Sequence, residues 1–94
     1  MSSDDEALEM LIDQTINGAV STIPMQLDEI RQNKDALQVD NPEEFVYGLI
    51  MGMALGMGSA ILTAQKGVPT PEDQLKVRDM VYKKIPEIRE QIFK

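Results

Sequence analysis

The residues of this chain that could do chemistry are mostly carboxylates near its beginning. Asp4, Asp5, Glu6, Glu9 and Asp13 include pairs four residues apart, which share one face of a helix. Oxygen ligands of this kind can hold Mg²⁺ or Ca²⁺ loosely. Their spacing matches neither an EF-hand loop nor the Glu-x-x-His motif of a carboxylate di-iron site, so it favours a solvated helix face over a metal site.

Three methionines form the second group with chemical potential. Met51, Met53 and Met57 lie close together in the sequence, and thioethers can bind Cu(I). The chain has no Cys and no His to accompany them. The pattern therefore favours methionines that fill irregular space around a glycine-rich helix. We expect neither a metal nor another cofactor.

Catalytic motifs are absent from the sequence. Without His or Cys, acid–base or nucleophilic work would fall to Asp, Glu, Lys, Tyr or Ser. Tyr47 and Tyr82 suit amphipathic packing better than proton transfer. The sequence contains no GxxxxGK[ST] phosphate loop. We do not expect an enzyme. A pocket enzyme that uses carboxylates is the alternative, and a carboxylate of raised pKa in a concave pocket would be its mark.

Charge is distributed unevenly along the 94 residues, whose net charge is −7. Residues 1–65 carry a net charge of −9 and residues 66–94 a net charge of +2. This acidic balance argues against nucleic-acid binding, which needs a basic surface. The acidic start does not resemble a signal or transit peptide, so we expect a cytoplasmic protein with one domain.

The longest uncharged stretch, residues 45–65, has the sequence FVYGLIMGMALGMGSAILTAQ. A spacing of four places its small residues along one ridge of a helix, with the GxxxG pattern of close helix pairs. This ridge contains Gly48, Gly52, Gly56, Ala60 and Ala64. A helix that is apolar on every side must be buried on every side. A further apolar interface is expected at Leu49, Met53, Met57 and Ile61.

Local signals predict an all-α, small four-helix bundle-like domain around this central glycine-rich helix. Asn41 and Thr70 are good N-caps, and each precedes a proline suited to the first helical position. Pro24 and Pro86 interrupt apolar stripes and should break or kink their helices. The expected helices span about residues 4–21, 24–38, 42–66 and 71–93, with a kink near Pro86.

Opposite charges on the first and last helices predict that these two helices are neighbours, within the chain or across a dimer. The first helix has five acids and no base before Pro24. The last helix supplies the cations Lys76, Arg78, Lys83, Lys84 and Arg89. Such surface pairs attract weakly, by about 0–1 kcal/mol each.

The small-residue ridge leaves three hypotheses open. It could pair with a second copy, it could receive another helix of the same chain, or it could join two single-span membrane proteins. The other helices have apolar stripes that need a shared core, and aromatic residues flank only one end of the stretch, which disfavours the membrane. We therefore expect a soluble module for oligomerisation or binding to a protein partner, most simply a homodimer, because the other helices are too short to cover the central one.

Overall fold

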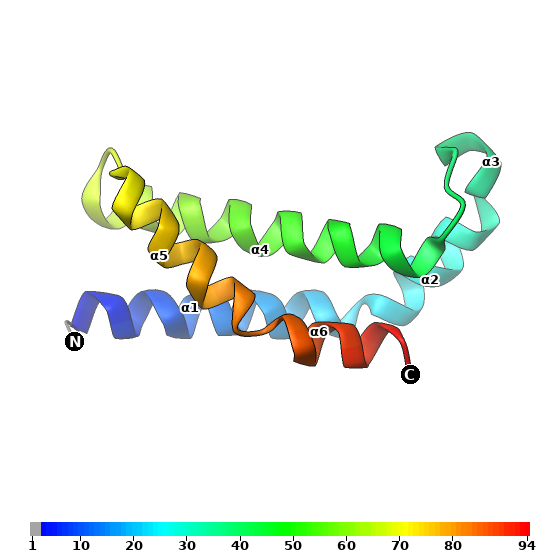
Figure 1. The fold of residues 1–94 in the computed structure, drawn as a ribbon, viewed down its shortest axis with the longest axis horizontal. Coiled ribbons are helices and arrows are strands. Elements are labelled where there is room, and N and C mark those ends of the chain that lie inside the picture. The colour runs from blue at the N-terminus through cyan, green and yellow to red at the C-terminus, as the bar shows by residue number, and fades with distance from the viewer. Residues whose placement is uncertain (1–2) are drawn as a thin grey trace.

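The computed structural model describes residues 3–94, with side chains from Asp5 onwards. Over these residues the protein is all-α, as expected, and contains no strand. Figure 1 shows its helices in order: α1 (Ser3–Ser21), α2 (Ile23–Gln32), α3 (Lys34–Leu37), α4 (Pro42–Lys66), α5 (Pro71–Tyr82) and α6 (Ile85–Ile92). The side chain of Asp4, one of the expected acidic group, lies outside the described residues.

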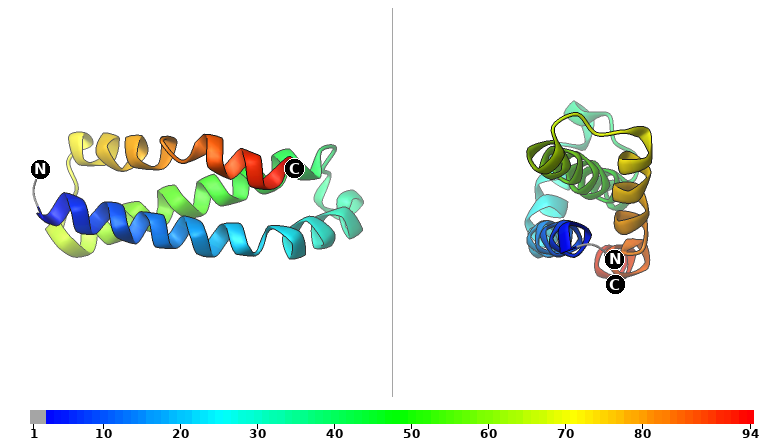
Figure 2. Two further views of the ribbon diagram at one scale, coloured as in Figure 1. Left: turned by 90° about the horizontal axis from the view of Figure 1, so that it is seen from below. Right: turned by 90° about the vertical axis from the view of Figure 1, so that its left-hand side faces the viewer.

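These helices form three rods that lie side by side (Figure 2). The first rod is α1 with α2, the second is α4, and the third is α5 with α6. Each compound rod is interrupted just before a proline, because Pro24 and Pro86 lack the N–H that would continue the preceding helix. The molecule measures 44 × 24 × 16 Å. Its radius of gyration of 14.7 Å exceeds the about 12 Å typical of a compact chain of this length.

The expected helix over residues 24–38 is divided, and this is a correction to the sequence-based prediction. Helix α2 ends at Gln32 and α3 begins at Lys34. The side-chain amide of Asn33 donates to the carbonyl oxygen of Glu29 at 2.8 Å, a local bond that favours a helix end. Gln38 then adopts a left-handed backbone with φ of 56°, which ends α3.

Helix α4 has the bounds expected from the sequence. The side chain of Asn41 accepts a hydrogen bond from the Glu44 N–H at 3.2 Å, and Pro42 begins the helix. Gly67, with φ of 84°, follows its last residue and takes the backbone geometry that favours glycine. Helix α5 begins with a complete capping box, in which Thr70 and Asp73 satisfy each other's backbone N–H.

One side of α4 forms the centre of the core. Its buried residues recur every fourth position and are Val46, Ile50, Ala54, Gly58 and Leu62. Leu8, Ile12 and Ile16 of α1 belong to the same buried core, together with Val77 and Val81 of α5 and Ile88 of α6. At the middle of this contact, a Cβ atom added to Gly58 would lie 2.6 Å from Val77 Cγ1 and 3.4 Å from Ile12 Cδ1. Gly58 therefore lets three helices approach closely.

Candidate functional site

The small-residue ridge of α4 faces away from the core. Gly48, Gly52 and Gly56 are each offset by two residues from a buried position, which is about 200° around the helix. A Cβ atom added to any of these three glycines would meet nothing within 4 Å. Ala60 and Ala64, which complete the ridge, are also exposed. Among the described residues, then, no other helix of the chain occupies the groove that the ridge creates.

A second row of side chains lies beside the glycines. Leu49, Met53 and Met57 are 40%, 46% and 49% exposed. Ile61 continues the row in sequence, but it is half-buried and packs against the core.

These two rows define a surface that we call the α4 outer face, made of Gly48, Leu49, Gly52, Met53, Gly56 and Met57. It has no charged side chain, and all six of its residues are exposed. Figure 2 shows that the other two rods leave one side of α4 uncovered. Within the described residues, α4 is the one helix long and apolar enough to cross a membrane. Only 28% of its most apolar 18-residue stretch is buried inside the molecule. A core helix of a soluble protein of this size would normally be buried on more of its surface.

An apolar pocket of about 500 Å³ adjoins the α4 outer face. It lies between the α2–α3 corner and α4, and Leu49 belongs to both the pocket and the outer face. Ile30, Ala36, Leu37 and Phe45 contribute the rest of its apolar lining. The amide of Asn33 at its edge is hydrogen-bonded to the backbone of its own helix. The pocket therefore extends the apolar surface, and Glu29 is the one ionisable residue in its lining.

Carboxylates with perturbed pKa values occur elsewhere, and each is lowered. A hydrogen bond from Arg31 lowers the pKa of Glu43, and one from Arg89 lowers the pKa of Glu44. Hydrogen bonds from Lys66 and from the Thr70 N–H lower the pKa of Asp73 to about 2. These groups stay ionised at neutral pH, which suits ion pairing rather than general acid catalysis.

The acidic residues of α1 pair with the basic residues of the third rod. Asp5 lies 3.1 Å from Lys76, and Glu9 lies 3.0 Å from Lys83. Asp13 Oδ1 lies 3.3 Å from the ammonium of Lys84, within ion-pair range but without hydrogen-bond geometry. The predicted proximity of the first and last helices is therefore confirmed, within one chain. No cluster of three potential metal ligands occurs in the part of the chain that the structure describes.

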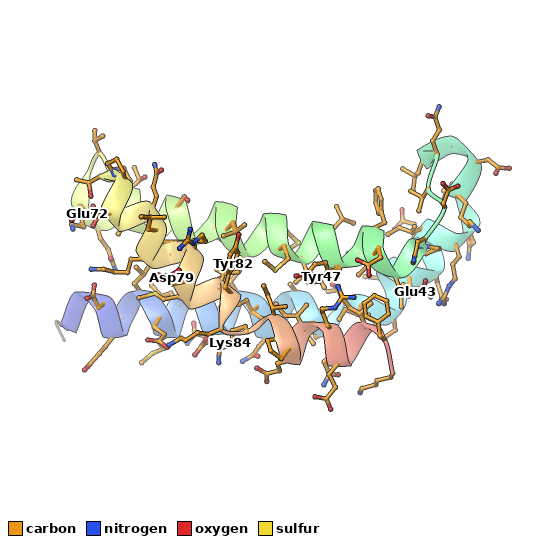
Figure 3. The ribbon with its side chains drawn as sticks, in the orientation of Figure 1. Glu43, Tyr47, Glu72, Asp79, Tyr82 and Lys84 are labelled. Carbon is orange, nitrogen blue, oxygen red and sulfur yellow. The ribbon has the colours of Figure 1, made fainter. Side chains whose placement is uncertain are left out.

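Sequence reasoning missed the role of Arg89 on α6. Its guanidinium lies 4.7 Å from the ring centre of Tyr47 and 4.5 Å from that of Phe93. It also donates to Glu44 at 2.9 Å. Figure 3 labels Tyr47 on the side of α4 towards α6. The contacts with Tyr47 and Glu44 connect the end of the third rod to α4, and these two residues are too far from Arg89 in sequence for a local pattern to show them.

Comparison with protein-family models, with curated proteins and with solved structures gives no match to this chain.

Proposed function

We propose that this protein is a self-associating helical module, which forms a soluble homodimer through the α4 outer face. The observation that supports the proposal is the open row of glycines beside exposed Leu49, Met53 and Met57. The other two rods cover one side of α4 and leave the other side bare. A second copy placed there would cover the same surface on both chains at once.

The size of the bare surface agrees with an association site. With Ala60 and Ala64, which continue its ridge, the α4 outer face extends over residues 48–64 and is about 25 Å long and about 10 Å wide, from the rise and diameter of an α-helix. An apolar strip of a few hundred Å² is at the size where exposed patches on soluble proteins mark interaction sites. A stable interface covers about 800 Å² on each partner, so the adjoining pocket at Leu37 and Phe45 would add to it.

A lipid bilayer suits this surface less well than a second chain. Crossing the membrane would require α4 to leave the two rods that bury Val46, Ile50 and Leu62. Lying on a membrane is also unfavourable, because residues 28–44, around the N-terminal end of α4, contain six acids and two bases and anionic lipids repel them. Glycines leave a lipid-facing helix with little side chain to bury, whereas they allow a protein helix to approach closely.

Size-exclusion chromatography with light scattering, without detergent, tests the proposal. The Gly56→Leu variant should shift the protein from dimer to monomer, because the new side chain fills the groove. Gly18→Leu on α1 is the matched control, since an added Cβ there also meets nothing within 4 Å but lies off the outer face. It should leave the dimer unchanged. A monomeric unmodified protein, or a protein that requires detergent to stay in solution, would overturn the proposal.

A further inference from the structure

We infer that the two copies pair with their α4 helices antiparallel about a two-fold axis, so that the Leu49, Met53 and Met57 row of each copy fills the glycine row of the other. This inference rests on the proposed homodimer. It adds which side chain of one copy lies against each glycine of the other, and whether the two α4 helices are parallel or antiparallel.

The two rows of the α4 outer face have matching dimensions. Both have three members spaced four residues apart, and they lie side by side on one helix. One row projects, with exposed fractions of 40–49%, and the other is a groove with open space at every Cβ position. Ridges of four-residue spacing pack into grooves of the same spacing. A surface that contains both is complementary to itself, which favours a second copy over a different protein.

In an antiparallel two-fold arrangement, a single register of the two helices places each of the three projecting side chains opposite a glycine of the other copy. Met53 of one copy then faces Gly52 of the other, near the axis. Leu49 faces Gly56, and Met57 faces Gly48, on either side of the axis. The symmetry repeats these three contacts, so that each copy inserts three side chains and receives three.

Charge at the ends of α4 selects the antiparallel direction over the parallel one. Residues 28–44, around the N-terminal end of α4, contain six acids and two bases. At its C-terminal end, residues 64–83 contain three acids and four bases, and the α1 acids Asp5, Glu6 and Glu9 lie beside them, so the net charge there is −2 against −4 at the N-terminal end. A parallel pair would bring the two more acidic ends together, whereas an antiparallel pair places each of them beside a less acidic end. Opposed helix dipoles favour the same direction.

Single cysteines test the direction directly, because the native chain has none. Gly52→Cys, near the axis, should form a disulfide-linked dimer on oxidation in either direction. Leu49→Cys and Gly56→Cys should each give no more than the background of Gln14→Cys, an exposed position on α1. A refolded mixture of Leu49→Cys and Gly56→Cys should cross-link about half of its chains, which is the share of mixed dimers expected from random pairing of equivalent subunits.

The outcomes separate this inference from the proposed function. Cross-linking of Leu49→Cys alone and of Gly56→Cys alone, with none between them in the mixture, means a parallel pair; the inference is then wrong and the homodimer stands. Absence of cross-linking for Gly52→Cys, with a monomeric mass, removes the homodimer itself. Circular dichroism of each variant before oxidation shows that the helices are intact.

Discussion

Gly58 provides the sharpest test of the packing, because it is the glycine at which three helices meet. In Gly58→Ala the new Cβ would lie 2.6 Å from Val77 Cγ1, closer than such atoms can approach. Val77 is 2% exposed, and its branched side chain has few alternative rotamers. The helices must therefore move apart or Val77 must shift.

The expected loss of stability follows from two opposing effects. Overpacking a core by one methyl group costs about 1–3 kcal/mol. Replacing glycine with alanine inside a helix stabilises by about 1 kcal/mol. Gly58→Ala should therefore be neutral to about 2 kcal/mol less stable than the unmodified protein. Gly18→Ala, where an added Cβ meets nothing, should show only the gain of about 1 kcal/mol.

Urea unfolding followed by circular dichroism measures this difference. A second substitution, Val77→Ala, removes the atom that the new Cβ would strike. In that background Gly58→Ala should stabilise as much as Gly18→Ala does. The coupling free energy between the substitutions at Gly58 and Val77 should then lie in the range of about 0.5–3 kcal/mol that is typical of residues in contact. If Gly58→Ala in the unmodified background stabilises the protein as much as Gly18→Ala, the close approach of α1, α4 and α5 is wrong.

Three further predictions concern the polar contacts. Arg89→Lys keeps the charge but loses the planar stacking on Tyr47 and Phe93, so urea unfolding should show a loss of about 1 kcal/mol. Because the pKa of Asp73 is lowered from 3.8 to about 2, its contribution to stability is complete above its ordinary pKa and is lost as the pH falls towards 2. Asp73→Asn should therefore lose less of its urea midpoint between about pH 5 and about pH 2 than the unmodified protein; an equal loss would contradict the assignment. Lys83→Glu breaks the pair with Glu9 and should destabilise by about 0–1 kcal/mol in low salt, with a smaller effect in 1 M salt, whereas the same charge change at Lys94 is the control.

The parts of the fold that were predictable from sequence are those set by local signals. Asn41 with Pro42, and Thr70 with Pro71, mark the starts of α4 and α5 because cap and first turn are neighbours in the chain. The interruptions before Pro24 and Pro86 follow from the missing N–H of proline. The division between α2 and α3 was not predicted, because it depends on a side-chain bond of Asn33 and has no glycine or proline to mark it.

The direction in which each glycine faces depends on tertiary packing. Gly58 and Gly56 are the same residue type two positions apart, yet one lies in the core and the other in open space. The sequence did contain a signal that Gly58 is buried, since Gly58 belongs to the same row of residues, spaced four apart, as Val46, Ile50 and Leu62. Sequence reasoning gave more weight to the small-residue spacing and did not connect Gly58 with that apolar row.

The central claim is that the outer face of α4 is covered by a second copy of the chain. Sedimentation equilibrium of the unmodified protein in detergent-free buffer, over a wide range of concentration, tests this most directly. We expect twice the chain mass of 10.5 kDa, with dissociation only on dilution. A mass of 10.5 kDa that persists at high micromolar concentration would mean that the bare face of α4 needs no second copy, and would contradict the account.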